Sequence, residues 1–457
     1  MMRELRGARV LVVGLGDSGL SMVRWARRQG ASVRGTDTRA APPCAGTIQR
    51  ELPDVPLVLG VAPDGEIAGA DIVAVSPGVD RRSGAIARAA RRGVPVLGDI
   101  EFFAQAISAL SDAPPVIAIT GSNGKSTVTA MAGAVCTAAG LSPLVAGNIG
   151  LPVLDAWTGI ENGAAMPGAV VLELSSFQLE STITLRPRAA TVLNVTEDHL
   201  DRYDGMADYA AAKERIFTGD GMQVINREDR WSAGMRLPGR RAVTFGLDAP
   251  QAPDDWGMSG DMTLVRGDVA LAAADTLRVR GLHNAANALA AGALCRAIGI
   301  ADAAITRGWQ AFDGLPHRSK IINKINNIEF IDDSKGTNVG ATVAALNGMR
   351  GGVVLIAGGD GKGQDFGPLA TAVKGKARSV VLIGRDAGKI ALAIGTAAPV
   401  QRAADMTEAV ELAYSAAREG DAVLLSPACA SYDMYRNYIH RAEDFAAAVA
   451  ALERRHA

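Results

Sequence analysis

Short apolar runs that alternate with amphipathic stretches are the feature that most constrains the fold of this chain. Apolar runs occupy residues 10–13, 72–75 and 116–119, and a glycine-containing turn follows each of them. The alternation continues to a helix expected over residues 441–454. Because strands that alternate with helices form parallel sheets covered by helices, we predict an α/β protein with doubly wound sheets.

The chain is too long for a single hydrophobic core. It has 457 residues, whereas one domain usually takes about 100–200 residues. Pro114 and Pro115 precede a new strand, and the sequence GLP at residues 314–316 marks a second boundary. We therefore predict three α/β domains. They are a Rossmann-like domain over residues 1–103, a central ATPase-like domain with a phosphate loop over residues 104–314, and a Rossmann-like domain over residues 315–457.

Composition and charge narrow the class of protein. Hydrophobic residues make up 48% of the chain and charged residues 21%, which is typical of a globular protein. The formal net charge of −1 provides no positive field to attract nucleic acid or an anionic membrane. The four cysteines lie far apart without a C-x-x-C pair, which argues against a disulfide framework and a zinc site. The first apolar run is too short for a signal peptide or a membrane span, so we expect a cytoplasmic protein.

The first glycine-rich turn is a candidate nucleotide site. Residues 14–19 read GLGDSG, which matches G-x-G-x-x-G, and Asp37 follows about 20 residues later. In this arrangement the N–H groups at a helix start hold a pyrophosphate while the acid holds a ribose. The pattern fits a nicotinamide cofactor and also fits a βα turn without a ligand. Asp17 within the turn is an unfavourable neighbour for an anion.

The second glycine-rich loop is more specific. It reads TGSNGKST over residues 120–127, between an expected strand and an expected helix, although Ile119 stands where the strict phosphate-loop pattern has glycine. Backbone N–H groups of such a loop wrap the phosphates of ATP, Lys125 neutralises phosphate oxygens, and the Ser126 hydroxyl suits Mg²⁺. The residues predicted here to bind ATP are Gly121, Ser122, Asn123, Gly124, Lys125, Ser126 and Thr127.

Other candidates follow the next expected strands. Glu173 lies at the carboxyl end of a strand, where sites in parallel sheets gather, and its oxygens suit Mg²⁺. His199 lies in an acidic stretch after the following strand and is either a structural histidine or an imidazole near the metal. Lys213 by itself reads as a solvated helix lysine. Asn284 and Asn287 fit a helix start with capping amides, or amides presented to a purine.

In their order along the chain, these motifs resemble those of the Mur ligases of peptidoglycan synthesis. The resemblance covers essentially the whole chain. It implies an ATP-dependent ligase that adds D-glutamate to UDP-N-acetylmuramoyl-L-alanine through an acyl phosphate, releasing ADP and phosphate, and residues 426–431 favour D-glutamate as the amino acid. The motifs that carry the resemblance are residues 120–127, 147–150, 173–180, 194–203, 283–287, 317–318, 333–338, 358–362 and 426–431.

The resemblance also implies a role for each matching residue. The UDP-linked substrate is assigned to Asp17, Ser18, Asp37, Thr38, Arg39, Asn148, Ser175 and Gln178. ATP is further assigned to Asn284 and Asn287 on the adenine side and to Arg318, Asp333 and Lys335 of the third domain. D-glutamate is assigned to Thr337, Lys362, Ser431 and Tyr438. The family also has phenylalanine at the position of Tyr438. Two Mg²⁺ ions are implied, one held by Ser126 and Glu173 and one by His199 and a carbamylated Lys213, and the residues implied in catalysis are Lys125, His199 and Lys213.

Three rival interpretations stay open on the sequence alone. Another Mur-type ligase or a folate polyglutamate ligase would share the phosphate loop and differ in the motifs at the amino-acid end. An oxidoreductase that uses residues 14–19 would retain a nicotinamide cofactor. A nucleotide-dependent scaffold would bind ATP without glutamate-dependent phosphate release. If the chain is the D-glutamate ligase that the resemblance implies, we expect a monomer that acts on small molecules, with no nucleic-acid or membrane partner.

Overall fold

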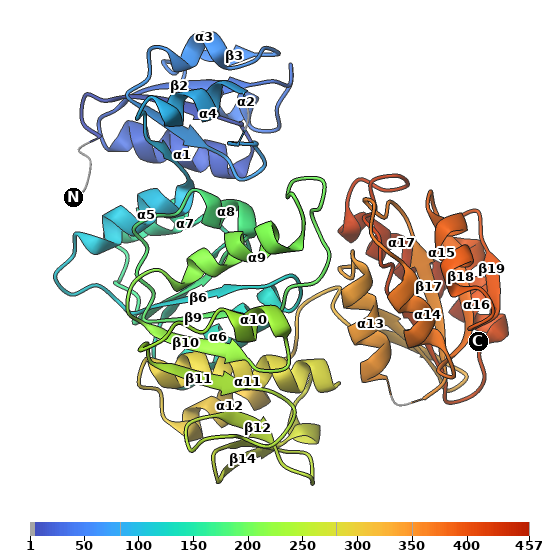
Figure 1. Ribbon diagram of the computed structural model, residues 1–457. Helices are drawn as coiled ribbons and strands as arrows, with labels where there is room; N and C mark the ends of the chain where they lie inside the picture. Colours follow the sequence, from blue (N-terminus) through green and yellow to red (C-terminus); the bar gives the residue numbers. More distant parts are fainter. Residues whose placement is uncertain (1–4, 83, 280, 350, 457) are drawn as a thin grey trace.

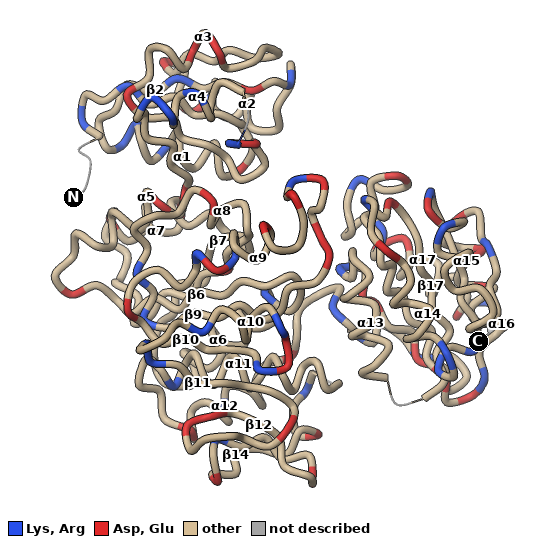
Figure 2. The backbone as a smooth tube through the Cα atoms, in the orientation of Figure 1, with Lys and Arg blue, Asp and Glu red and all other residues tan. Residues whose placement is uncertain are grey.

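The chain forms three α/β units in series, each built on its own sheet (Figure 1). The computed structural model describes residues 5–82, 84–279, 281–349 and 351–456. The expected α/β architecture with three sheets is confirmed. Lys and Arg positions are interspersed with Asp and Glu positions along the backbone of all three units, as the net charge near zero suggests (Figure 2).

The first unit is a parallel sheet of five strands in the order β3-β2-β1-β4-β5. Its strands are short, and β4, which is entirely apolar, is buried along its whole length. The carboxyl ends of β1 and β4 therefore lie next to each other, at the glycine turn. The elements are β1 (Arg9–Val13), α1 (Asp17–Arg28), β2 (Ser32–Asp37), α2 (Ala45–Glu51), β3 (Leu57–Leu59), α3 (Asp64–Ile67), β4 (Ile72–Val75), α4 (Gly84–Arg91) and β5 (Val96–Leu97).

The central unit has nine strands in the order β14-β13-β12-β11-β10-β9-β6-β8-β7. All pairs are parallel except β12 with β13 and β13 with β14. Its strands are β6 (Val116–Thr120), β7 (Pro143–Gly147), β8 (Ala169–Glu173), β9 (Ala189–Val192), β10 (Met222–Asn226), β11 (Ala242–Phe245), β12 (Trp256–Met258), β13 (Thr263–Arg266) and β14 (Val269–Ala273). Its helices are α5 (Asp99–Ser108), α6 (Lys125–Ala138), α7 (Val153–Glu161), α8 (Ser176–Glu180), α9 (Met206–Glu214), α10 (Arg230–Gly234), α11 (Leu282–Ala297) and α12 (Asp302–Ala311), with short 3₁₀ turns at Arg215–Phe217 and Ala274–Thr276.

The third unit has six strands in the order β15-β16-β20-β17-β18-β19. Only β15 runs antiparallel, paired with β16 at one edge. Its elements are β15 (Lys320–Ile325), β16 (Ile328–Asp332), α13 (Val339–Gly348), β17 (Val353–Gly358), α14 (Gly367–Val373), β18 (Ala377–Ile383), α15 (Ala387–Ile394), β19 (Val400–Arg402), α16 (Met406–Ala416), β20 (Ala422–Leu425) and α17 (Tyr438–His456).

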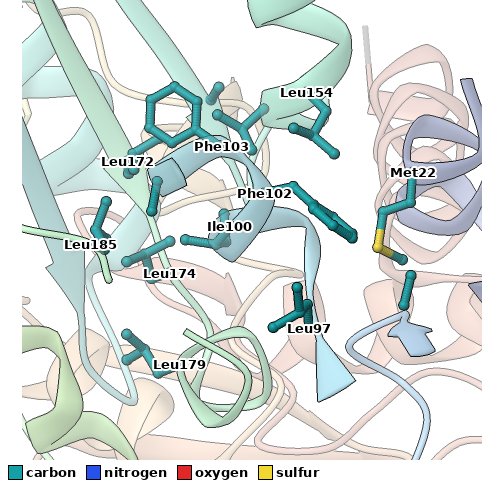
Figure 3. Close-up of a cluster of buried hydrophobic side chains, with 14 of the residues drawn as sticks. Met22, Leu97, Ile100, Phe102, Phe103, Leu154, Leu172, Leu174, Leu179 and Leu185 are labelled. Carbon is teal, nitrogen blue, oxygen red and sulfur yellow. The ribbon is translucent and has the colours of Figure 1, made fainter. Parts of the chain in front are cut away.

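One apolar cluster joins the first unit to the central one. Met22 of α1 and Leu154 of α7 lie near Phe102 of α5, and the cluster continues into the central sheet at Leu172 (Figure 3). Residue 103, where we expected the first domain to end, thus lies inside α5 and is fully buried. The clusters of the third unit contain no residue that precedes residue 322.

The helix that follows the phosphate loop is held tightly. Helix α6 packs against α11 and α12, and a Cβ added at Gly308 of α12 would lie 2.5 Å from the Cα of Val135 in α6. Two helices meet this closely only where one lacks a side chain. The same packing brings Asn287 of α11 next to Gly124 of the loop. Among the described residues no helix combines the length and the apolar character that a membrane crossing requires.

Candidate active site

The phosphate loop closes around the start of α6. Gly124 has a φ of 84° in the left-handed region and precedes Lys125, and its added Cβ would lie 2.7 Å from the Asn287 side-chain oxygen. Asn194 brackets the loop because its Oδ1 accepts from the Asn123 N–H at 2.8 Å and its Nδ2 donates to the Asn123 carbonyl at 3.1 Å. The loop is therefore preorganised with its N–H groups at a helix start, which is the geometry that receives phosphate.

Two lysines share one carbonyl oxygen of this loop. Lys125 Nζ donates to the carbonyls of Gly121 and Ser122, both at 2.8 Å, and Lys213 Nζ donates to Gly121 at 2.9 Å. The Lys213 side chain lies 4.5 Å from the centroid of the Tyr209 ring and is only 1% exposed. Burial lowers the pKa of Lys213 well below its ordinary value, and the charge of Lys125 lowers it further. The arrangement favours a neutral amine at Lys213.

Glu173 has one oxygen that the protein does not satisfy. Its Oε1 accepts from Asn148 Nδ2 at 2.7 Å, whereas Oε2 is buried without a hydrogen-bond partner in the described part of the chain. An orphan carboxylate oxygen beside a phosphate loop fits a cation ligand. No group of three or more His, Cys, Asp and Glu side chains that could hold a metal occurs among the described residues. Mg²⁺ is commonly held by one or two carboxylates together with phosphate oxygens and water.

His199 faces the same region from a strained loop. Its backbone φ is 55°, its ring meets Phe177 edge-on at 4.8 Å, and its Nε2 lies 3.6 Å from Asp198 Oδ2. Burial lowers the pKa of His199 although Asp198 acts in the opposite direction. A neutral imidazole is the form that binds metals.

The third unit reaches the phosphate loop directly. Arg318 Nη2 donates to the Ser126 hydroxyl at 2.7 Å, and Asn338 Nδ2 donates to Asn123 Oδ1 at 3.0 Å. Lys362 Nζ lies 2.9 Å from Asp198 Oδ1. The third and central units are therefore in contact, with cations of the third unit at the edge of the loop.

A cavity of about 190 Å³ is lined by Asn123 of the loop and Arg318 of the third unit, and it shares lining residues with a second cavity of about 710 Å³. Burial raises the pKa of Asp333 to about 6 and lowers that of Lys335 to about 8. Lys335 Nζ lies 3.9 Å from the ring centroid of Tyr438. Predicted ATP residues that line the smaller cavity are Asn123, Gly124, Thr127, Asn284, Asn287, Arg318, Asp333 and Lys335.

A third cavity, of about 820 Å³, lies at the glycine turn of the first unit. Asp37 accepts there from the Leu15 N–H at 2.8 Å and from Arg39, whose guanidinium lowers the pKa of Asp37 to about 2. Asn148 of the central unit also lines this cavity, and its side chain donates to Glu173. The predicted substrate residues among its lining are Asp17, Ser18, Asp37, Thr38, Arg39 and Asn148.

Family models match all three units. The Mur ligase MurD-like N-terminal domain matches residues 8–98, the Mur ligase middle domain residues 119–295, and the Mur ligase glutamate ligase domain residues 317–429. The chain belongs to the Mur ligase family.

Two curated relatives of this Mur ligase share one name. A UDP-N-acetylmuramoylalanine--D-glutamate ligase of Thiobacillus denitrificans is 53% identical, with 98% of this chain and 97% of the relative covered. One of Nitrosospira multiformis is 51% identical, with the same coverage. Among solved structures, MurC of Thermotoga maritima has a TM-score of 0.60 at 20% identity, covering 97% of this chain and all of that one. MurF of Acinetobacter baumannii has a TM-score of 0.61 at 17% identity, covering 99% of this chain and 92% of that one. The expected family is confirmed.

Not every predicted residue of this Mur ligase lies at a cavity. Ser175 caps α8, its side chain accepting from the Gln178 N–H, and Gln178 Nε2 donates to Asp99 at 3.2 Å. Neither residue is among those lining the cavity at the glycine turn. Their contact with the substrate stays a prediction, and the partners observed show that both residues hold the start of α8, three residues after Glu173, in place.

The predicted glutamate residues are spread over the loops of the third unit. Thr337 donates its backbone N–H to the Lys335 carbonyl at 2.8 Å, and Tyr438 packs against Lys335. Lys362, with a φ of 52°, points to the central unit, whereas Ser431 is buried. The glutamate pocket formed by these four residues stays a prediction.

Three residues of the site were not singled out from the sequence. They are Asn194, which brackets the phosphate loop, Asn338, which caps α13 and reaches Asn123, and Asp198, which pairs with Lys362. Asn338 carries a detectable signal, because an asparagine directly before a helical pattern is a preferred N-cap. Asn194 and Asp198 act through partners distant in sequence, which no local pattern reveals.

Proposed function

We propose that this Mur ligase joins D-glutamate to UDP-N-acetylmuramoyl-L-alanine at the expense of ATP. The substrates are proposed from the names of relatives that cover nearly the whole chain at about half identity. The chemistry rests on one observation, the meeting of Lys125, Lys335 and Arg318 at the phosphate loop. A small-molecule substrate, a monomeric state and a cytoplasmic location fit this proposal.

The first step is attack of the L-alanyl carboxylate on the γ-phosphate, which forms an acyl phosphate and releases ADP. Two anions repel each other, so the site has to neutralise charge as they approach. Lys125 at the loop and Lys335 and Arg318 from the third unit bring three cationic side chains to the region. Mg²⁺ held by Ser126 and Glu173, and by His199 with a carbamylated Lys213, would add further positive charge to the phosphate oxygens.

The second step is attack of the D-glutamate amine on the acyl phosphate, with phosphate leaving from the tetrahedral intermediate. Water competes with the amine for the same carbon atom, so the site has to be covered during this step. The contacts from Asn338 to Asn123 and from Lys362 to Asp198 hold the third unit over the loop. This arrangement brings the predicted glutamate loops to the edge of the nucleotide cavity.

Phosphate release tests the proposal directly. Purified protein is given ATP, Mg²⁺ and UDP-N-acetylmuramoyl-L-alanine, with each candidate amino acid in turn. We expect phosphate release that depends on D-glutamate. Release with a different amino acid would indicate another Mur-type ligase, ATP binding without release would indicate a scaffold, and nicotinamide absorbance of the purified protein would indicate an oxidoreductase.

Lys362→Ala is expected to raise the KM for D-glutamate strongly while the KM for the UDP-linked substrate stays nearly unchanged. A buried carboxylate of the amino acid needs a charge-assisted donor, and the loss of one costs on the order of tenfold or more in affinity. The matched control is Lys324→Ala, which removes an exposed lysine from β15 of the same unit. Equal weakening of both substrates, or of neither, would show that glutamate binds elsewhere.

A further inference from the structure

A short strap connects the UDP-substrate cavity of the first unit to the central unit. The strap consists of residues 79–82, which follow β4 and the turn at residues 76–78. Val79 packs on the glycine turn so closely that a Cβ added at Gly14 would lie 2.7 Å from its Cγ2. Val79 and Asp80 also line the cavity of about 820 Å³. The strap is therefore a wall of that cavity.

The far end of the strap binds two helices of the central unit. Arg81 donates to the carbonyl of Glu180, the last residue of α8. Arg82 forms a two-pronged ion pair with Asp208 in the first turn of α9, in which Nη2 donates to Oδ1 at 3.2 Å. The Arg82 guanidinium also lies 4.6 Å from the centroid of the Tyr203 ring. Both arginines thus join elements about a hundred residues apart in sequence.

The central unit also donates a hydrogen bond to the strap. Arg202 Nη2 donates to the Val79 carbonyl at 3.1 Å and to Glu180 Oε2 at 3.0 Å. The Arg202 and Glu180 side chains are 12% and 7% exposed, so this pair is shielded from water. The Arg202 guanidinium lies 4.7 Å from the Phe177 ring centroid, and Phe177 packs against His199. A continuous chain of contacts therefore runs from the cavity wall to the loop of His199.

Each segment that the strap contacts carries a predicted metal ligand or lies close to one in sequence. Helix α8 begins three residues after Glu173, the loop of Arg202 contains His199, and α9 carries Lys213. Two contacts of this network are slightly too long for hydrogen bonds. Glu180 Oε1 lies 3.6 Å from Arg82, and Arg202 Nε lies 3.8 Å from Asp80. Glu180 Oε1 and Arg202 Nε are buried without a hydrogen-bond partner in the described structure. A small movement of the strap would bring each of them within hydrogen-bond distance of its partner.

Building on the proposed function, we infer that Arg81 and Arg82 are positioning residues for the ligase reaction. They fix the distance between the cavity that holds the UDP end of the substrate and the segments that surround its reacting carboxylate. The substrate is bound at both ends, so an error in this distance displaces the carboxylate from the γ-phosphate. Displacements of about 1 Å can reduce the rate of an oriented reaction by up to about 10²-fold.

A double-mutant cycle on Arg82 and Asp208 tests this inference. Arg82→Gln and Asp208→Asn are each expected to lower kcat/KM for the UDP-linked substrate on the order of tenfold. The double variant is expected to be no worse than either single variant, because the two residues act as one pair. The KM for D-glutamate is expected to stay unchanged. The dissociation constant of UDP alone, measured by calorimetry, is also expected to stay unchanged, because the residues proposed to hold the UDP moiety, such as Asp37 and Arg39, belong to the first unit.

The control is Arg9→Gln, because Arg9 pairs with Asp71 at 2.8 Å within the first unit and both side chains are exposed. This variant is expected to keep wild-type kinetics. Single variants within twofold of wild type would overturn the inference, as would multiplied losses in the double variant. A matching loss of affinity for UDP alone would also overturn it, since the strap would then only shape the cavity. Failure of the proposed function is separate, because the wild-type protein itself would then show no D-glutamate-dependent phosphate release.

Discussion

Lys125→Ala is expected to lower turnover on the order of 10²–10³-fold while the protein remains folded. Lys125 is the cation at the start of α6, and its Nζ lies at hydrogen-bond distance from two carbonyls of the phosphate loop. When a nucleotide binds, the same ammonium group can donate to the phosphate oxygens instead of the loop carbonyls. Charge that develops during phosphoryl transfer is then stabilised by a group already in position.

The measurement for Lys125→Ala is phosphate release with saturating ATP, UDP-linked substrate and D-glutamate. Circular dichroism and a thermal melt establish that the variant is folded. Lys376→Ala is the control, because Lys376 lies between α14 and β18 of the third unit and its Nζ donates to the Asn347 carbonyl at 3.2 Å. Near-wild-type phosphate release by Lys125→Ala would show that another group neutralises the transferring phosphate.

Lys213→Ala is expected to abolish most of the activity, with a loss on the order of 10²-fold or more. An ammonium group would repel Mg²⁺, whereas a carbamate on the same nitrogen supplies oxygen ligands. Carbamylation joins CO₂ to the neutral amine, and the burial that lowers the pKa of Lys213 favours that form. The contact between Lys213 and the Gly121 carbonyl places the amine at the loop that receives the phosphates.

Two measurements distinguish a carbamate from a structural lysine. Protein equilibrated with ¹³C-bicarbonate is expected to show a carbamate carbon signal by NMR that is missing from Lys213→Ala. Lys213→Arg keeps a positive charge without forming a carbamate and is expected to be as inactive as the alanine variant. Full activity of either variant, or an unmodified Lys213 in a crystal loaded with metal and ATP, would contradict the prediction.

The sequence predicted the α/β architecture because strands and glycine turns are local signals. The apolar run at residues 116–119 and the loop that follows form β6 and the start of α6, as expected. Strands β12, β13 and β14 were not predicted. They form an antiparallel edge of the sheet, which the alternation of strands and helices in a parallel sheet does not predict. Helix α5 was not predicted either, because a helix that packs against two units has the same local pattern as any other helix.

The candidate site was predicted unevenly for the same reason. Lys213 read as a solvated helix lysine, and only the family resemblance indicated a role, yet its side chain is almost fully buried. Burial of a lysine depends on partners such as Gly121, which lies 92 residues away in sequence. Arg82 and Asp208 are separated by 126 residues, so no spacing rule could pair them. Local sequence shows which groups are available, and the tertiary fold decides which of them meet.

The apolar cluster that runs through α5 joins the first and central units into one rigid part of the molecule, and the third unit forms a second part. The first and central units share this cluster, so separating them would expose buried hydrocarbon to water. The third unit has its own clusters and meets the phosphate loop through the polar contacts of Arg318, Asn338 and Lys362. Water can replace such contacts at little cost in free energy. Swinging of the third unit should therefore be fast and sensitive to salt, with only a small change in heat capacity, and ADP and phosphate can leave while the UDP end of the product stays bound.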